Sequence, residues 1–309
     1  MSRPEEVRVF APASLSNMGP GFDVLGLALT RPGDIVLARR VAAPGVRIVR
    51  ATGGVPTDVE RNTAGVAARE TLRRAGMMDV GIELEVEKGM AIGTGLGSSA
   101  ASAAAAAVAV NLLLGAPLRK QELVGPCVEA EASVAGRHGD NVSPSLLGGL
   151  CLVRSVDPAD VIRIPVPEGM MVVVASPAFE LSTKIARAAL PDCVPLRSLV
   201  KSTANIAALV AACYAGDVAL LARSLDEDIV VPVRAGLIPG ATEVMAAARE
   251  AGALGSTISG AGPSIFALCH SEARAVVVGE AMKRAFLEHG GLESEIIISV
   301  ADAPGARPL

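Results

Sequence analysis

Gly93-Thr94-Gly95-Leu96-Gly97-Ser98-Ser99-Ala100 places three glycines at alternate positions and two serines directly after them. Residues 81–87 before it alternate strictly between Glu and an apolar side chain, which predicts a half-buried strand. The Ala-rich residues 99–114 after it predict a helix that Ser98 or Ser99 caps and that Gly115 and Pro117 end. A glycine loop in this setting can bind a phosphate, because its N–H groups approach an anion closely and the helix N-terminus adds positive partial charge.

The loop matches neither of the two commonest nucleotide-binding patterns. The P-loop pattern GxxxxGK[ST] is absent, and the dinucleotide pattern GxGxxG fails because Ser98 stands at its third glycine. Glycine N–H groups and two serine hydroxyls could still hold a nucleotide without a P-loop lysine. The alternative is a plain strand-to-helix turn whose serines cap the helix.

The rest of the chain predicts strands and helices in mixed order. The first half predicts a strand at 7–10, a loop at 12–22 and a helical stretch at 118–134 with a kink or break at Pro126. The second half predicts strands at 171–175, 264–269 and 294–300 and helices at 183–190, 197–214, 217–226, 240–251 and 272–289. This order favours an α+β fold over a doubly wound parallel sheet. Prolines 158, 165 and 167 indicate a boundary near residue 165, which gives domains 1–165 and 166–309.

Composition argues against several classes of protein. The 309 residues are 51% hydrophobic, so the chain can bury a large core and is not disordered. A net charge of −4 and 2% aromatic residues argue against nucleic acid as a partner. The longest apolar stretch, 100–114, is interrupted by Ser102 and Asn111, and the first residues lack a secretion signal, so we expect a cytoplasmic protein with no membrane partner. The five scattered cysteines predict neither a disulfide framework nor a zinc site.

Two more segments favour the nucleotide-binding interpretation of the glycine loop over a plain strand-to-helix turn. They are residues 12–23, PASLSNMGPGFD, and residues 256–264, STISGAGPS. Together with the loop they resemble the signature set of the GHMP small-molecule kinases, in the right order and spacing over nearly the whole chain. Within that superfamily the chain is most similar to homoserine kinases, through Asn17, Asp23, residues 138–144 (HGDNVSP) and residues 182–187 (STKIAR). One departure is Ala91, where the family usually has Pro.

The resemblance implies a two-domain GHMP kinase fold. Its N-terminal domain is like the second domain of ribosomal protein S5, and its C-terminal domain is a ferredoxin-like α+β domain. It also implies ATP and Mg²⁺ as cofactors. The residues that it assigns to ATP and its phosphates are Ala91, Ile92, Gly93, Thr94, Gly95, Leu96, Gly97, Ser98, Ser99, Ala100, Ala101, Gly260 and Gly262, with Asn62 and Thr63 against the base. Mg²⁺ would be held by Ser98 and an acidic residue, and the distance from Gly136 favours Glu131 over Glu129.

The acceptor site implied by the resemblance suits an amino acid. Asp23 would bind the ammonium group, and Arg187 and Arg234 would bind the carboxylate, since a guanidinium pairs well with a carboxylate. Asn17 and His138 complete the predicted substrate residues.

Four residues are predicted to act near the reacting atoms. Thr183 would lie near the γ-phosphate, and His138 would orient the substrate or stabilise charge. Asp140 could accept the hydroxyl proton and Asn141 could position the hydroxyl, although the family has also been interpreted as lacking a dedicated base.

The implied reaction is ATP-dependent phosphorylation of the L-homoserine hydroxyl, giving O-phospho-L-homoserine and ADP in threonine biosynthesis. The first alternative is another GHMP kinase acting on mevalonate or a sugar, but these acceptors have no ammonium group for Asp23. The second is an RNA-binding module, which the acidic charge and scarce aromatics disfavour. Many relatives are dimers, so the resemblance is compatible with a homodimer, although the sequence itself does not show the oligomeric state.

Overall fold

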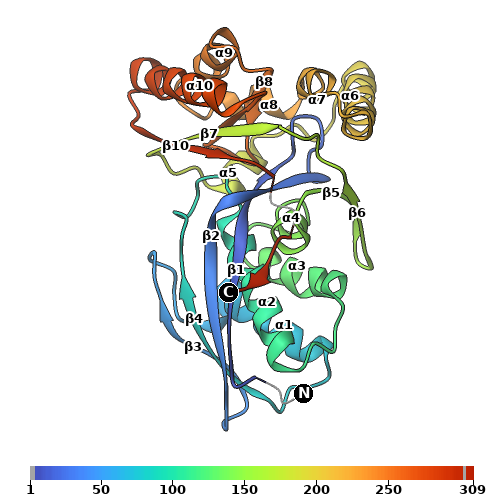
Figure 1. The fold of residues 1–309 in the computed structure, drawn as a ribbon, viewed down its shortest axis with the longest axis vertical. Helices are drawn as coiled ribbons and strands as arrows, with labels where there is room; N and C mark the ends of the chain where they lie inside the picture. The colour runs from blue at the N-terminus through green and yellow to red at the C-terminus, as the bar shows by residue number, and fades with distance from the viewer. Residues whose placement is uncertain (1–3, 302–303) are drawn as a thin grey trace.

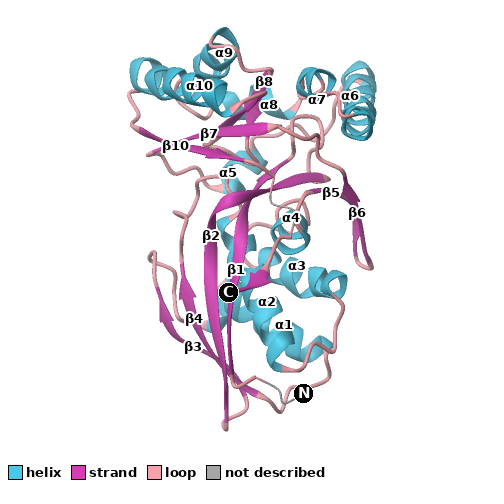
Figure 2. Ribbon diagram, viewed as in Figure 1, coloured by secondary structure: helices cyan, strands magenta, loops and turns pink. Residues whose placement is uncertain are grey.

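The computed structural model describes residues 4–301 and 304–309. Within these residues the strands form two sheets, one of seven strands and one of four. Figure 1 shows the larger sheet along the N-terminal half of the chain and the smaller sheet stacked at one end of it. Figure 2 shows that the helices of the first half gather on one face of the larger sheet.

The larger sheet is almost entirely antiparallel. Its strands are β1 (Glu6–Ser16), β2 (Leu25–Val41), β3 (Gly45–Ala51), β4 (Gly81–Glu87), β5 (Leu150–Val156), β6 (Ala159–Ile164) and β11 (Arg307–Pro308). The order is β11-β1-β2-β4-β3, with β5 and β6 added beside the first residues of β2. Among the described pairings of this sheet only β3 with β4 is parallel.

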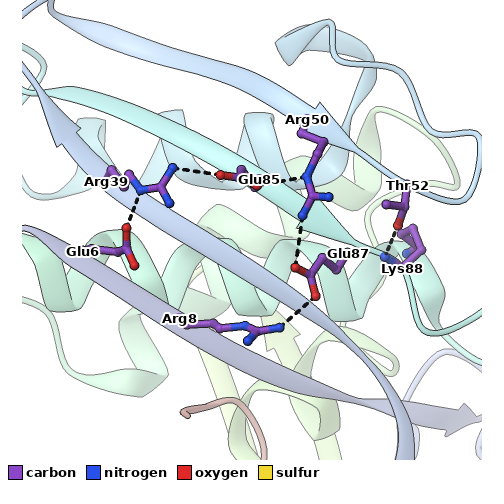
Figure 3. A network of polar contacts seen from close by, with 8 residues as sticks. All are labelled: Glu6, Arg8, Arg39, Arg50, Thr52, Glu85, Glu87 and Lys88. Carbon is purple, nitrogen blue, oxygen red and sulfur yellow. Dashed lines mark hydrogen bonds and ion pairs between the residues drawn. The ribbon is translucent and has the colours of Figure 1, made fainter.

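The solvent face of this sheet carries alternating charges (Figure 3). Arg39 pairs with Glu6 and Glu85, and Arg50 joins Glu85 to Glu87. The alternation predicted for residues 81–87 is confirmed, because Ile82, Leu84 and Val86 are buried on the opposite face. Each exposed ion pair contributes little to stability, so the network chiefly marks which face is in water.

The buried face packs against helices from the first half. They are α1 (Thr63–Arg74), α2 (Ser98–Leu113), α3 (Val124–Ala132) and α4 (Val142–Leu147), with short 3₁₀ segments η1 (Val59–Arg61) and η2 (Lys120–Leu123). Helix α2 is central, since it packs against β1, β2, α1, α3 and α4. Its many alanines are almost all fully buried and allow its neighbours to approach on every side.

The smaller sheet has the antiparallel order β10-β7-β9-β8. Its strands are β7 (Met171–Pro177), β8 (Gly255–Ile258), β9 (Ile265–Cys269) and β10 (Ser294–Ser299). The helices of this half are α5 (Thr183–Ala188), α6 (Leu196–Ala215), α7 (Val218–Arg223), α8 (Val230–Ala235), α9 (Ala241–Glu250) and α10 (Glu272–Ala285), followed by a π-helical turn, η3 (Phe286–Gly290). Helices α9 and α10 pack against this sheet, and α6 and α7 pack against each other.

Three local predictions were wrong. Neither Ser98 nor Ser99 caps α2, because the helix begins at Ser98 and its N-cap is Gly97. Pro126 does not break a helix, because it lies in the first turn of α3, where a missing N–H costs nothing. The break lies earlier, between η2 and α3. Strand β1 also runs on to Ser16, through half of the loop predicted at 12–22.

The α+β prediction is confirmed by the two largely antiparallel sheets. Strand β6 ends at Ile164 in the larger sheet and β7 begins at Met171 in the smaller one, so a division near residue 165 stays a proposal. Two features join the halves. Strand β11 pairs with β1, and Val172, Val174 and Phe266 of the smaller sheet belong to the same buried cluster as the core of the larger one.

Candidate active site

A cavity of about 500 Å³ is lined by both halves of the chain. The end of β1, the start of α1, the glycine loop and the loop before α4 line it from the first half. The segment that contains α5, together with Arg234 and Gly260, lines it from the second half. Loop and helix-end residues therefore meet between two rigid sheets, which is where ligands commonly bind.

The glycine loop is tightly enclosed by the other two signature segments. A Cβ on Gly97, whose φ is +65°, would lie 2.2 Å from Ser14 Oγ and 2.8 Å from Asn141 Oδ1. A Cβ on Gly95, whose φ is +77°, would lie 2.7 Å from the carbonyl oxygens of Ser259 and Gly262. Both positions therefore require glycine, because a Cβ would clash with neighbouring atoms and because their φ values are positive.

A buried ion pair anchors the start of α2, directly after the glycine loop. Lys88 pairs with Asp34 and donates hydrogen bonds of 2.8 Å to the Ser98 carbonyl and to Ser102 Oγ. Asp34 also accepts hydrogen bonds from Ser102 Oγ and the Gly89 N–H. Burial lowers the pKa of Lys88, and the nearby Asp34 carboxylate opposes that shift. This pair fixes the first turn of α2, and none of the quoted motifs indicates it.

Charged side chains cluster at one side of the cavity. Arg187 Nη2 and Nη1 donate to the two carboxylate oxygens of Asp23 at 2.8 and 3.1 Å. His138 Nδ1 lies 3.5 Å from Asp23 Oδ2. The guanidinium carbons of Arg187 and Arg234 lie 5.1 and 5.2 Å from the centre of the Phe22 ring. Four segments distant in sequence therefore form one charged cluster against the Phe22 ring.

Arg234 is buried at 2% exposure in the last turn of α8. The Glu227 carboxylate accepts the N–H groups of residues 229–231 and so fixes the start of this short helix. Arg234 Nη1 donates to the Gly260 carbonyl at 2.6 Å. Burial, followed by the charge of Arg187, lowers the pKa of Arg234 to about 10. The side chain therefore stays cationic at neutral pH while much of its hydration is removed.

Residues 17–23 hold an unusual backbone conformation. Asn17, Met18 and Asp23 have φ values of +70°, +47° and +61°. The Asn17 side chain fixes the loop, because Oδ1 accepts the Asp23 N–H at 3.2 Å and Nδ2 donates to the Gly260 carbonyl at 3.1 Å. Left-handed conformations at residues other than glycine are strained, and they persist where the surroundings over-determine them, often at ligand sites.

Comparison with known proteins identifies the family. Residues 62–149 match the GHMP kinases N terminal domain and residues 209–288 match the GHMP kinases C terminal domain. Homoserine kinase of Arabidopsis thaliana is 46% identical over 97% of this chain and 84% of that protein. The chain belongs to the GHMP kinase family. Homoserine kinase of Xanthomonas campestris pv. campestris is 42% identical over 98% of this chain and 94% of that protein. The crystal structure of homoserine kinase from Cytophaga hutchinsonii matches with a TM-score of 0.94 and 42% identity, covering 100% of this chain and 99% of that one.

A GHMP kinase uses ATP. The cavity also contains oxygen groups that would suit a divalent metal ion. Among the described residues, Ser98 Oγ and Glu131 Oε1 are buried and have no hydrogen-bond partner. Burial raises the pKa of Glu131 to about 7, against a hydrogen bond from Ser99 and the charge of Lys88. Two buried, unpartnered oxygens fit Mg²⁺, which prefers oxygen ligands and takes further ones from phosphate and water. The structure shows no cluster of three His, Cys, Asp or Glu in its described residues, so the nucleotide would have to complete the site.

Glu129 has a different environment from Glu131. It forms an exposed ion pair of 2.7 Å with Arg137 and does not line the cavity. Glu131 is only 6% exposed and does line it. Burial and position in the cavity thus favour Glu131 over Glu129.

The loop before α4 brings three polar side chains to the cavity. Asn141 is fixed by Ser14 Oγ, which donates to Oδ1 at 2.9 Å, and by Ser16 Oγ, which accepts from Nδ2 at 3.0 Å. Burial, followed by the charge of Asp23, raises the pKa of Asp140 to about 7. Burial lowers the pKa of His138, so its imidazole is neutral at pH 7. A neutral His and a carboxyl group that titrates near pH 7 are suited to proton transfer.

Nearly all of the predicted site residues line this one cavity. The exceptions are Ala91, Leu96, Ala100, Ala101 and Gly262. Ala100 and Ala101 are buried in the core face of α2, and Leu96 is buried beneath the loop. Asn62 caps α1 through the Ala64 N–H, and Thr63 Oγ1 donates to the Ser99 carbonyl. These placements bring the residues together, while the role of each one stays a prediction.

Several residues that hold the site have no role in the sequence motifs quoted above. Ser14 and Ser16 orient Asn141, and Lys88 and Asp34 hold the start of α2. A signal for the serines was present, since both lie in the quoted segment 12–23. Lys88 directly follows the alternating strand, but the sequence does not show that Asp34, far back along the chain, is its partner.

Proposed function

We propose that the chain transfers the γ-phosphoryl group of ATP to the side-chain hydroxyl of L-homoserine, giving O-phospho-L-homoserine and ADP in threonine biosynthesis. The observation that carries the proposal is one cavity that joins a glycine loop at a helix N-terminus to a cluster of two arginines and a carboxylate. The full-length similarity to homoserine kinases points to the same acceptor.

The charged cluster recognises the amino acid. Arg187 Nε and Arg234 Nε are buried without a hydrogen-bond partner in the described part of the chain, so each arginine keeps a donor for a carboxylate. Asp23 would turn one carboxylate oxygen to the ammonium group and share the other with Arg187. Mevalonate and sugars have no ammonium group, so they would leave Asp23 paired with arginine alone. Of these acceptors, only homoserine carries an ammonium group that could partner the Asp23 carboxylate in addition to the arginine that already pairs with it.

The glycine loop and α2 hold the nucleotide. The loop N–H groups and the N-terminus of α2 favour the negative phosphates, and Ser98 and Glu131 would hold Mg²⁺. When bound, the metal neutralises charge on the phosphates. Thr183, the first residue of α5, brings a hydroxyl to the opposite wall of the cavity. Phosphoryl transfer depends mostly on such positioning and charge stabilisation.

Asp140 is proposed as the base. As the homoserine oxygen forms its bond to the γ-phosphorus, the bond from that phosphorus to the bridging oxygen breaks and ADP leaves. The hydroxyl proton passes to the Asp140 carboxylate, whose pKa of about 7 leaves it largely ionised at pH 8. Asn141, fixed by Ser14 and Ser16, would hold the hydroxyl for attack.

An acceptor panel tests the proposal. ADP release is measured with L-homoserine, mevalonate, galactose and 4-hydroxybutyrate, which is the acceptor without its amino group. We expect L-homoserine to be preferred by at least a hundredfold in kcat/KM over each other acceptor. Equal use of 4-hydroxybutyrate would refute recognition of the ammonium group, and preference for mevalonate or galactose would refute the proposed acceptor. Cytoplasmic location and a homodimer stay proposals alongside it.

A further inference from the structure

Lys184 is an unpaired cation in the wall of the active-site cavity. It is the second residue of α5 and lies within the quoted segment 182–187. Its side chain is exposed and lines the same cavity as the glycine loop. Within residues 4–301 and 304–309 it forms no ion pair and no side-chain hydrogen bond. Its charge is therefore free to bind a ligand in the cavity.

Helix α5 and the residues just before it connect the glycine loop with the charged cluster. Before the helix, Glu180 packs on the loop, since a Cβ on Gly93 would lie 2.8 Å from Glu180 Cγ. Near the other end of the helix, Arg187 Nη2 donates to Asp23 Oδ1 at 2.8 Å. Figure 1 shows α5 between the two sheets. Lys184 therefore lies between the nucleotide side and the acceptor side, where the γ-phosphoryl group would pass.

The other cations of the cavity already have partners or lie elsewhere in it. They are Arg61, Lys88, Arg187 and Arg234. Lys88 is held in a buried ion pair. The two arginines of the charged cluster donate to the Asp23 carboxylate and to the Gly260 carbonyl. Arg61 directly precedes the two residues predicted to contact the base. Among the described lining residues, this leaves Lys184 as the cation for the end of the triphosphate.

We infer that Lys184 is a catalytic residue whose ammonium group contacts the γ-phosphate of ATP and stabilises its charge during transfer. The inference rests on the proposed kinase activity and adds to it a cation for the γ-phosphate, since the chain has no P-loop lysine. As the acceptor oxygen bonds to the γ-phosphorus, the bond to the bridging oxygen breaks and its electron pair leaves with ADP. The γ-oxygens stay negative throughout, so Lys184 stabilises them without gaining or losing a proton.

The alternative is a lysine that is merely solvated on the surface of a helix, as most lysines are. The placement of α5 argues against it. Lys184 and Arg187 are three residues apart, which puts them on the same side of the helix, and both line the cavity. Ile185, which is 58% exposed, does not line it. Lys184 thus shares the ligand side of α5 and not its solvent side.

Nucleotide affinity tests the contact without any acceptor. In calorimetric titrations of the full chain with Mg²⁺, Lys184→Met should weaken ATP binding at least about fivefold and leave ADP binding unchanged, because only ATP has a γ-phosphate. Lys283→Met is the matched control, since Lys283 is exposed in the last turn of α10 and does not line the cavity. It should change neither affinity. Unchanged ATP binding by Lys184→Met, or an equal loss of ATP and ADP binding, would overturn the inference.

Steady-state ADP release tests the catalytic part. Lys184→Met should lower kcat at least about thirtyfold and leave the KM for homoserine within about twofold, because Asp23, Arg187 and Arg234 still hold the acceptor. Lys184→Arg should restore most of kcat, since a guanidinium also pairs with phosphate. An unchanged kcat in Lys184→Met, or a Lys184→Arg variant that is equally slow, would overturn the inference. A wild-type melting temperature in each variant shows that it is folded.

This inference and the proposed acceptor can fail separately. A wild-type chain that prefers mevalonate or galactose would refute homoserine as the acceptor, while the ATP and ADP affinities would still decide the role of Lys184. Conversely, a homoserine-specific enzyme in which Lys184→Met has wild-type ATP affinity and kcat would overturn only the role of Lys184.

Discussion

Replacing Glu131 with Gln should stabilise the ligand-free protein while disabling it as an enzyme. Burial raises the pKa of Glu131 from 4.5 to about 7. At about 1.4 kcal/mol for each pH unit, keeping this carboxylate ionised costs the fold about 3 kcal/mol. Gln has nearly the same shape and carries no charge. The variant therefore avoids the cost, which is typical of a residue kept for function at the expense of stability.

The stability gained by Glu131→Gln should increase with pH. Between pH 4.5 and 7 the unfolded chain loses the Glu131 proton while the folded chain keeps it, so wild-type stability falls as pH rises through that window. The advantage of Glu131→Gln should be about 1 kcal/mol at pH 5 and about 3 kcal/mol at pH 8, measured as a melting temperature several degrees higher at pH 8.

The same substitution should impair Mg²⁺-dependent activity. We expect Glu131→Gln to raise the Mg²⁺ concentration needed for half-maximal ADP release at least tenfold, because a metal ligand loses its charge. Glu129→Gln is the matched control two residues away, where the side chain is exposed and pairs with Arg137. Glu129→Gln should change neither the melting temperature nor the Mg²⁺ concentration needed for half-maximal ADP release. A stability gain that is equal at pH 5 and pH 8, or a larger Mg²⁺ effect from Glu129→Gln, would refute the reasoning.

Ser98→Ala should lower kcat at least tenfold at saturating ATP with little change in melting temperature, since Ser98 Oγ has no hydrogen-bond partner among the described residues. Unchanged kcat would remove Ser98 from the site. Arg234→Leu should weaken homoserine binding by roughly 2–5 kcal/mol and leave the KM for ATP nearly constant, as steady-state kinetics would show. A parallel loss of ATP affinity would contradict this. Asp140→Asn should cost about a hundredfold in kcat at pH 8 and abolish the fall in kcat/KM expected below pH 7. If Asp140→Asn kept the wild-type kcat and the wild-type pH dependence of kcat/KM, Asp140 would not be the base. Lys88→Met should destabilise the fold by about 3–5 kcal/mol in urea unfolding, because Asp34 would stay buried without its partner. Full stability would mean that Asp34 becomes protonated at little cost.

The parts of the fold that the sequence could predict are those with local periodicity. The Glu alternation of β4 and the Ala run of α2 predicted both elements within a residue or two. The long β2 was missed because its residues show no simple alternation over their whole length and its form depends on the sheet that it joins. Helix α1 was overlooked although its buried residues recur at helical spacing and Asn62 caps its start. The N-cap of α2 was wrong for a related reason. A serine would normally cap a helix, but here Gly97 takes the left-handed conformation that brings the loop against Ser14.

In the site too, contacts between residues far apart in the sequence could not be predicted from local patterns. The motifs named Asp23, Arg187 and Arg234, but they did not predict that Asp23 and Arg187 pair with each other. That pairing joins residues 164 positions apart, and no local pattern in one sequence encodes it. The choice of Glu131 over Glu129 rested on spacing alone, whereas burial now separates the two side chains.

Phe22 gives a spectroscopic opportunity. The chain has no Trp and only one Tyr, so its intrinsic fluorescence is weak. The Phe22 ring lies about 5 Å from two guanidinium groups that are proposed to bind the acceptor. A Trp at this position would be the sole indole in the chain, and its emission would change as a ligand drew the two cations away from its face. Binding of the amino acid could then be titrated optically, with no nucleotide present and no turnover.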